Sequence, residues 1–324
     1  MTSTVVAVVA SVCSVLTVGV ACASAQSYPT KPIRTVVPFP AGGGIDTVIR
    51  LLAPNLAERL GQTIVVDNRS GAGGTVGSEI VAKSAPDGHT LLATFSSHAT
   101  NATLYRNLKF DTVKDFAPIT LIGTVPNILV INPSMAVRNV RELIALAKQR
   151  PGEILYASVG NGTPAHLTAE LFNAMAGVDM RHVAYRGSAN SIVSLIAGET
   201  QVTFTTVLVA DPHVKAGKLR ALAVASLKRS TAMPGIPTID ESGVKGFEST
   251  AWYGLLAPAG VPRSVVERLN SAAVSVLGLP QIRDRLAQLG TEAVGSTPEA
   301  FDRLIRRDIS KWGKLVSALG LVAD

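Results

Sequence analysis

The feature that most constrains the fold of this chain is a repeated unit. In it, a short apolar strand passes through a glycine-rich or Ser/Thr-rich loop into an amphipathic helix. The first copy reads VVPFPAGGGIDTVIRLLA, residues 36–53, and the next reads NRSGAGGTVGSEIVAKSAPDG. Strands that alternate with helices in this way are typical of α/β folds with parallel sheets. We therefore expect an α/β protein.

The helix predicted after the first glycine loop has apolar side chains three or four residues apart, at Ile45, Ile49, Leu52, Leu56 and Leu60. Pro54 lies inside this helix and removes a backbone donor, so we expect a kink or a break there. Residues 118–123 and 127–132 read as two separate strand pieces. Thr163 is predicted to cap a later helix that starts at Pro164.

The strand–helix units form two clusters, which predict two α/β domains. We expect one domain at residues 26–125 plus 250–324, with helices at its C-terminal end, and the other at residues 126–249. Two crossings, near residues 122–129 and 247–256, would join them. Ligands of open α/β sheets bind at the carboxyl ends of the strands. We therefore expect a ligand cleft between the domains, closed by movement about the crossings.

The N-terminus resembles an export signal. Residues 5–20 are almost purely apolar, and Ala23-Ser24-Ala25 fits a small-x-small cleavage site, which predicts a signal peptide at residues 1–25 cut after Ala25. The segment before the apolar run carries no Lys or Arg, unlike an ordinary signal. A membrane anchor and a lipid-modified Cys22 are the alternatives. Cys13 and Cys22 are the only cysteines, so cleavage would leave no thiol for a disulfide or a nucleophile.

Charge and motifs exclude several classes of function. The formal net charge is +7, but the basic residues are scattered and aromatic residues make up only 5% of the chain, so we expect no nucleic-acid binding. The glycine loop at residues 71–77 has Val76 where a dinucleotide fingerprint needs glycine, and the one at residues 42–44 lacks the Lys-Ser/Thr of a phosphate loop. H-E-x-x-H and G-x-S-x-G are absent. We expect no cofactor, no metal ion and no catalysis.

The loops themselves favour an anion. Helix N-termini present unpaired N–H groups and a positive dipole end, and glycine lets a ligand come close. One such loop could be only a tight turn, but several on both predicted domains indicate recognition of a small anion by amides and hydroxyls. Asp46 fits a helix cap and would repel a bare carboxylate, so contact there needs a water or a donor group. Among the histidines, only His166 is as plausible a ligand contact as a structural residue.

Long blocks of the sequence resemble one family. They include YPTKPIRTVVPFPAGGGIDTVIRLLAPNLAERLGQTIVVDNRSGAGGTVGSEIVAKSAPDGHTLL, DFAPIT, PGEILYASVGNGTPAHLTAELF, VAYRGSA, VKAGKLRALAV, IPTIDESG and WYGLLAPAGVP. Over nearly all of the predicted mature chain, the sequence is similar to the receptors of tripartite tricarboxylate transporters, the Bug family of periplasmic solute-binding proteins. The resemblance implies a two-domain periplasmic-binding-protein fold of the Venus flytrap, type II-like kind, in the periplasm.

The resemblance also implies the ligand and the site. Family ligands are small carboxylates, such as di- and tricarboxylates, acidic amino acids and aromatic acids, and they are gripped partly through ordered waters. Thr205 and Thr206 fall where specificity side chains vary in the family. With them, the residues carried onto this chain are Phe39, Ala41, Gly42, Gly43, Asp46, Ser96, Ser97, Gly160, Asn161, Gly162, Thr163, His166, Tyr185, Gly187 and Ser188.

Three functions remain open at this point. The first is a monomeric receptor that delivers a carboxylate to a two-component membrane permease. The second is a ligand sensor that signals through a membrane partner without transport. The third is a secreted α/β hydrolase that uses Ser97 or His98. The identity of the ligand cannot be read from the glycine loops, because these are common to ligands of many shapes.

Overall fold

A computed structural model describes residues 28–185, 187–230 and 232–322. The predicted signal peptide, with Cys13, Cys22 and the cut after Ala25, lies outside the described residues. None of the described helices is long and apolar enough to span a membrane.

The first half of the chain alternates strands and helices, as the sequence predicts. Its elements are β1 (Ile33–Val37), α1 (Gly44–Leu60), β2 (Ile64–Asn68), a 3-10 turn at Ala72–Gly74, α2 (Thr75–Ala82), β3 (Thr90–Phe95), α3 (Ser97–Leu104), β4 (Phe116–Ile131) and α4 (Val140–Gln149).

The second half continues the alternation and ends in helices. Its elements are β5 (Leu155–Ser158), α5 (Pro164–Ala176), β6 (Arg181–Ala184), α6 (Ser188–Ala197), β7 (Val202–Thr206), α7 (Val207–Lys215), β8 (Arg220–Val224), β9 (Thr250–Pro258), α8 (Arg263–Leu277), α9 (Pro280–Gln288), β10 (Glu292–Ala293) and α10 (Pro298–Ala318).

The sheet is mixed and not parallel throughout. Its strands are ordered β2-β1-β3-β9-β4-β7-β5-β6, and β8 and β10 also pair with β4. The pairs β1–β2, β1–β3, β5–β6 and β5–β7 are parallel. Every pair that involves β4 or β9 is antiparallel. The expectation of parallel sheets therefore holds within each half and is wrong at the centre, because two long return strands lie between the halves.

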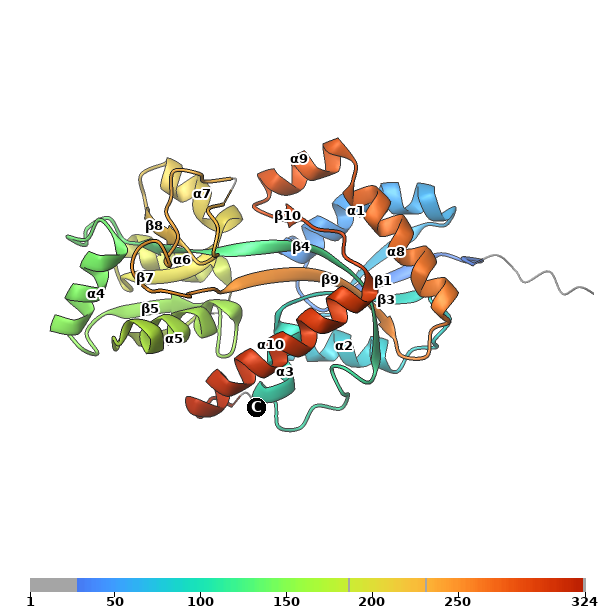
Figure 1. Ribbon diagram of the computed structural model, residues 1–324, viewed down its shortest axis with the longest axis horizontal. Coiled ribbons are helices and arrows are strands. Elements are labelled where there is room, and N and C mark those ends of the chain that lie inside the picture. Colours follow the sequence, from blue (N-terminus) through green and yellow to red (C-terminus); the bar gives the residue numbers. More distant parts are fainter. Residues whose placement is uncertain (1–27, 186, 231, 323–324) are drawn as a thin grey trace, which may run out of the picture.

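Strands β4 and β9 connect the two halves of the molecule, and Figure 1 shows them running side by side through its middle. The two strand pieces expected near residues 118–132 are one continuous strand, β4. Its first part, Phe116–Pro126, pairs with β9, and its last part, Asn127–Ile131, pairs with β7. One strand thus belongs to both halves of the sheet.

The buried side chains form separate cores in the two halves. Two clusters draw only on residues up to 125 and from 251 onward, with Ile49, Leu255 and Phe301 among them. Two others draw only on residues 128–247, with Phe172 and Phe204 among them. A small fifth cluster joins both sets and consists of Leu104, Leu167, Trp312 and Val316. It lies where α10 reaches from one half toward α5 of the other (Figure 1).

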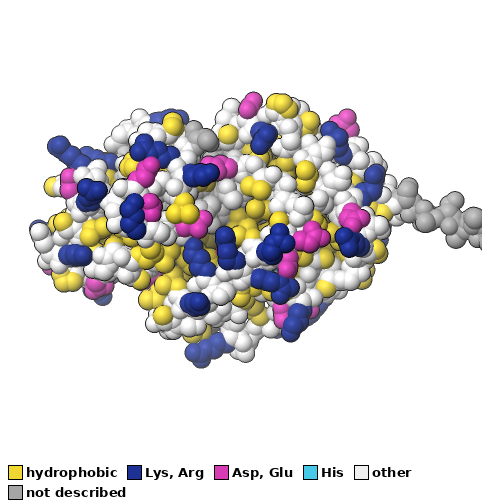
Figure 2. Space-filling model, in the orientation of Figure 1, with side chains coloured by type: hydrophobic (Ala, Val, Ile, Leu, Met, Phe, Trp, Pro, Cys, Tyr) yellow, Lys and Arg dark blue, Asp and Glu magenta, His cyan; other side chains and the backbone are white. Residues whose placement is uncertain are grey.

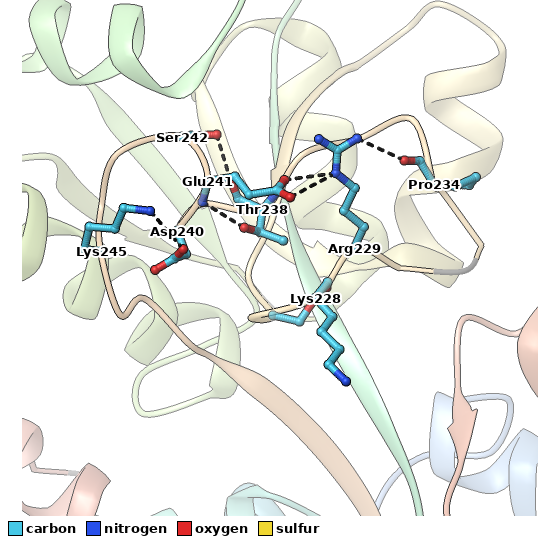
Figure 3. A network of polar contacts seen from close by, with 9 residues as sticks. Lys228, Arg229, Pro234, Thr238, Asp240, Glu241, Ser242 and Lys245 are labelled. Atoms are coloured by element: carbon cyan, nitrogen blue, oxygen red, sulfur yellow. Dashed lines mark hydrogen bonds and ion pairs between the residues drawn. The ribbon is translucent and has the colours of Figure 1, made fainter.

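The irregular segment between β8 and β9 is held by its own side chains (Figure 3). Arg229 pairs with Glu241 at 3.0 Å, and Glu241 accepts the N–H of Thr238 at 2.9 Å. Thr238 in turn accepts the N–H of Glu241 at 2.9 Å. The N–H of Ser249 donates to the carbonyl of Ala225 at 2.7 Å, which fixes the chain just before β9 begins.

Charges are mixed over the surface. Figure 2 shows Lys and Arg side chains on both halves of one face, with acidic side chains between them. Several charges of the described residues are paired, as in Lys215–Asp211 and Arg263–Glu267. Exposed pairs of this kind contribute little to stability, about 0–1 kcal/mol each.

Candidate functional site

The loop between β1 and α1, residues 38–43, is fixed by a buried carboxylate. Asp46 is only 2% exposed, and its Oδ2 accepts the N–H of Gly42 at 2.8 Å. Arg50 and Asn68 each donate to the same carboxylate at 3.0 Å. Burial acts to raise the pKa of Asp46, but the hydrogen bonds from Arg50, Gly42 and Asn68 outweigh it and hold the pKa below its usual value. The carboxylate is therefore ionised and neutralised inside the loop.

Asp46 does not cap α1 in the ordinary way. The N-cap is Gly43, which has no side chain to offer, and the helix begins at Gly44. Asp46 lies in the first turn and reaches back to the amide that precedes the cap. Its negative charge near the N-terminus also suits the helix dipole.

Phe39 packs between two loops. Its ring centre lies 4.4 Å from that of Phe95 at the end of β3. On the other side, a Cβ added to Gly74 would lie 2.7 Å from the ring, so the second glycine loop approaches Phe39 closely. The side chain is half-buried, and Pro40, Ala41 and Gly42 beyond it are exposed. Phe39 thus holds the exposed tip of the β1–α1 loop beside the end of β3.

A buried hydroxyl without a partner lies at the start of α3. Ser96 and Ser97 are 4% and 6% exposed. The N–H of Ser96 donates to the carbonyl of Trp252 at 3.1 Å. The Oγ of Ser97, by contrast, has no hydrogen-bond partner among the described residues. Buried hydroxyls nearly always have one, because leaving a buried polar group unsatisfied costs roughly 1–3 kcal/mol.

His98 does not activate Ser97. Its Nε2–H donates to the carbonyl of Thr112 at 2.9 Å, and burial lowers its pKa to about 4. Because the Ser97 hydroxyl bonds to no described group, the two side chains do not form the nucleophile–base pair that a hydrolase would need.

The loop between β5 and α5, residues 159–163, belongs to the other half of the molecule. Thr163 precedes Pro164 at the first position of α5, as predicted, and its hydroxyl donates to the carbonyl of Gly160 at 2.7 Å. The N–H of Gly162 donates to Nδ1 of His166 at 2.9 Å. His166 is 3% exposed, and burial together with His182 lowers its pKa to about 4. Asn161 is exposed at the tip of the loop.

Two further predicted segments follow neighbouring strands. The N–H of Tyr185 donates to the carbonyl of Ser158, which ties the end of β6 to the end of β5. Gly187 precedes α6 with a φ of +90°, a conformation that favours glycine, and Ser188 is the first residue of the helix. Thr205 and Thr206 are half-buried at the end of β7, and Thr206 is the N-cap residue of α7.

The structure brings the ends of β3 and β5 together. A cavity of about 10 Å³, large enough for about one water, is lined by Ser96, Thr100, Asn127, Pro164, Leu167, Ser249, Thr250, Ala251 and Trp312. Leu104 also touches the β5–α5 loop, since a Cβ on Gly162 would lie 1.8 Å from its Cδ2. The described residues of the β1–α1 loop, together with Tyr185, Gly187, Ser188, Thr205 and Thr206, are not among those that line this cavity.

Three polar residues beside this cavity could not be selected from local sequence patterns. Asn127 donates to Thr168 at 3.1 Å and to the carbonyl of Ser249 at 3.2 Å. The hydroxyls of Thr168 and Ser249 lie 2.5 Å apart. These buried groups bind the first turns of α5 to both central strands. Asn127, a polar residue within a strongly apolar strand, is the one signal that could have revealed them.

The comparisons with known proteins agree with this architecture. The sequence pattern of the family described as "Tripartite tricarboxylate transporter family receptor" matches residues 48–321. This chain belongs to that receptor family. Three solved structures are similar to the receptor over at least 89% of its length and essentially the whole of theirs.

The first of these structures is Rpa4515 of R. palustris with adipate, with 37% identity and a TM-score of 0.83. The second is the periplasmic binding protein BugD, with 34% identity and a TM-score of 0.80. The third is MatC from Rhodopseudomonas palustris with bound malate, with 31% identity and a TM-score of 0.79. These likenesses confirm the predicted α/β periplasmic-binding-protein fold of the receptor.

The receptor's described residues contain no group of three or more His, Cys, Asp or Glu side chains arranged to hold a metal ion. The polar groups described above at the strand ends include amides, hydroxyls and the neutralised carboxylate of Asp46. Such groups can bind and orient an anion.

Proposed function

We propose that this protein is a periplasmic receptor that captures a small carboxylate in an interdomain cleft and delivers it to a tripartite tricarboxylate-type membrane permease. The two domains would be residues 26–125 plus 250–324 and residues 126–249. The separate cores on either side of β4 and β9 support this division. Residues 1–25 would be the signal peptide that directs export.

The observation that carries the proposal is the unpartnered hydroxyl of Ser97. It lies in the first turn of α3, where helix N–H groups and the dipole favour negative charge. A carboxylate oxygen would supply the missing acceptor, and a hydrogen bond to a charged group contributes roughly 1.5–3 kcal/mol. Thr205 and Thr206 would add hydroxyls from the other half.

Two glycine amides are already engaged within the protein. Gly42 donates to Asp46, and Gly162 donates to His166. We infer that these residues shape the loops and clear space for the ligand rather than donate their amides to it. Asp46 need not repel a carboxylate, because its charge is balanced by Arg50 and two further donors.

The similar structures with adipate and malate support a dicarboxylate as the ligand class. Two carboxylates need donors at both ends, and the proposed site has strand ends from both halves. Ser97 would bind one end, and the hydroxyls at the end of β7 would bind the other. Acidic amino acids and aromatic acids belong to the same class of small acids.

A thermal-shift titration of residues 26–324, unfolded and refolded to remove bound ligand, tests the proposal. Adipate, malate and a panel of small acids are compared with their amides. At 100 times its Kd, a ligand adds about 2.7 kcal/mol, which should raise Tm by roughly 5 °C or more. A response to an amide but to no acid would contradict the proposal, and so would chemical turnover of the bound acid.

Ser97→Ala tests the residue that carries the argument. We expect it to weaken binding of the acid roughly tenfold or more, through loss of a charge-assisted hydrogen bond. The fold should stay intact because the hydroxyl supports no other group. Ser271→Ala, at an exposed position on α8, is the matched control and should bind normally. Equal affinities for the two variants would remove Ser97 from the site.

A further inference from the structure

We propose that His182 is a positioning residue. Through its stack on His166 and its hydrogen bond to Ser158, it would fix the backbone conformation of the β5–α5 loop. Protonation of His166 would disrupt that conformation. The proposal rests on the proposed function, because the loop matters for binding only if it lies against the carboxylate. Nothing in the sequence drew attention to His182, which lies 16 positions after His166 on the next strand.

The two rings form one unit. Their centres are 3.9 Å apart and their planes differ by 14°, so they are stacked. Tyr156 extends the stack, with its ring centre 5.0 Å from that of His182. The residues come from β5, β6 and the first turns of α5, three elements that meet at the proposed site.

Each histidine holds a different part of the loop. Nδ1 of His166 accepts the N–H of Gly162 at 2.9 Å. Nε2 of His182 lies 2.6 Å from Oγ of Ser158, and that oxygen accepts the N–H of Gly160 at 3.1 Å. The amides on both sides of Asn161 are thus set by the ring pair. A change in either ring would alter the loop tip without any contact between histidine and ligand.

The hydrogen bond from Gly162 fixes the tautomer of His166. A backbone N–H can only donate, so Nδ1 must keep its lone pair and the neutral ring must carry its proton on Nε2. Nε2 lies 3.9 Å from a carboxylate oxygen of Glu170, which also accepts the hydroxyl of Tyr156. A second proton on His166 would place an Nδ1–H group opposite the backbone N–H of Gly162 and so break the hydrogen bond between them.

The surroundings favour two neutral rings at neutral pH. Glu170, Tyr156 and His182 are the titratable groups that face His166 in the described structure. Burial lowers the pKa of His182 to about 4, and burial together with the facing ring of His182 lowers the pKa of His166 to about 4. Both rings line a pocket of about 320 Å³, through which water and protons can reach them. The loop should therefore keep its shape until the solution is clearly acidic.

Nitrogen NMR of the ligand-free protein, residues 26–324, tests the tautomer directly. With histidine and glycine labelled with nitrogen-15, five histidine side chains are observed and assigned by single substitutions. We expect His166 to be protonated on Nε2 alone at pH 7. The Gly162 amide resonance should move with a midpoint near pH 4. A proton on Nδ1 of His166 at pH 7 would overturn the proposal.

His182→Phe and His182→Gln separate positioning from packing. Phe keeps the stack but cannot bond to Ser158, whereas Gln can bond to Ser158 but stacks poorly. Neither side chain can become positively charged, so His166 should take up its proton more easily in both variants. The pH midpoint at which the Gly162 amide resonance moves should therefore rise. His213→Phe, on α7, should leave it unchanged. An unmoved midpoint in both His182 variants would contradict the proposal.

Affinity for adipate, with malate as a second probe, gives the functional test. We expect His182→Phe to weaken binding roughly tenfold, the loss that removal of one hydrogen bond produces, and His182→Gln to recover part of it. Tighter binding by His182→Phe than by His182→Gln would mean that the ring at position 182 only fills space, and would overturn the proposal. If neither acid binds the unchanged protein, the ligand assignment fails, and the NMR result still decides the role of His182.

Discussion

At the scale of single residues, the three glycines of the β1–α1 loop have different causes. Gly42 has a φ of +78°, which strains any other residue. Gly44 is required by packing, because an added Cβ would lie 2.1 Å from the hydroxyl of Tyr253. Gly43 has an ordinary φ of −71°, and its Cβ would approach only the carbonyl oxygen of Pro40, at 3.3 Å. Gly43 thus has the weakest structural need for glycine of the three, and we propose that ligand approach is the main reason for glycine there.

Gly43→Val should therefore abolish carboxylate binding and leave the fold intact. The branched side chain would occupy the approach to the loop, while the backbone conformation is one that valine can adopt. Calorimetric titration with the best acid, together with Tm, measures both effects. Gly235→Val is the matched control, since an added Cβ there meets nothing within 4 Å. Normal affinity in the Gly43 variant would exclude the loop from the site.

Gly44→Ala should show the opposite pattern, with a clear loss of stability. Its methyl group would collide with the Tyr253 hydroxyl, and overpacking of this kind costs about 1–3 kcal/mol. Adding Tyr253→Phe removes the oxygen and should restore part of the stability. Urea unfolding of the single and double variants measures this coupling. Additive effects of the two substitutions would show that the contact does not limit the packing.

At the scale of elements, α1 shows where local sequence reasoning is incomplete. Pro54 suggested a kink or a break, but the helix runs unbroken from Gly44 to Leu60. Pro54 is on the exposed side, so water can bond to the carbonyl that loses its partner. The apolar residues predicted from Ile45 to Leu60 are indeed its buried face. Burial of that face outweighs the missing hydrogen bond.

Helix α10 is fixed to the central strands by a buried acid. Asp308 is 5% exposed and accepts the indole N–H of Trp252 on β9 at 2.8 Å. Burial raises the pKa of Asp308, so ionisation of the folded protein is unfavourable there. A raised carboxylate pKa means that stability is lost as pH rises from the unfolded value through the folded one.

Asp308→Asn should consequently raise Tm at pH 7.5 and have less effect near pH 4. Asparagine keeps an acceptor for Trp252 and cannot ionise. Thermal unfolding at the two pH values measures the difference. Asp302→Asn is the control on the same helix, where the carboxylate pairs with exposed Arg306 and contributes little. A lower Tm of the Asp308 variant at both pH values would mean that the negative charge itself is stabilising.

At the scale of the whole molecule, the sequence predicted individual strands and helices better than it predicted how distant strands pair. The α/β class and the helix start at Pro164 follow from local patterns and are confirmed. The antiparallel centre was not predictable, because the pairing of β4 with β9 joins residues more than 120 positions apart. The same holds for His182, whose stack on His166 depends on how β5 and β6 align. Of the predicted site, the structure brings together the ends of β3 and β5, and the ligand contacts stay a prediction.

The burial of histidine predicts how the whole protein responds to acid. His98, His166 and His182 each have a pKa lowered to about 4, mainly by burial. The unfolded chain would bind protons at these residues near pH 6.5, before the folded protein does. Stability should therefore fall as pH drops from about 6.5 toward 4, whereas carboxylates with a lowered pKa, such as Asp46, act only at lower pH.

Urea unfolding at several pH values between 7.5 and 4.5 measures this response. The slope of the unfolding free energy against pH should correspond to uptake of about two to three protons on unfolding. Asp308 reduces this number, because its raised pKa in the folded protein acts in the opposite sense. His98→Phe should flatten the slope by up to one proton, because its ring no longer titrates in the unfolded chain. Ser271→Ala, at an exposed position on α8, is the control and should leave the slope unchanged. Stability that stays constant between pH 6.5 and 4.5 would show that the three rings are accessible enough to protonate in the folded state.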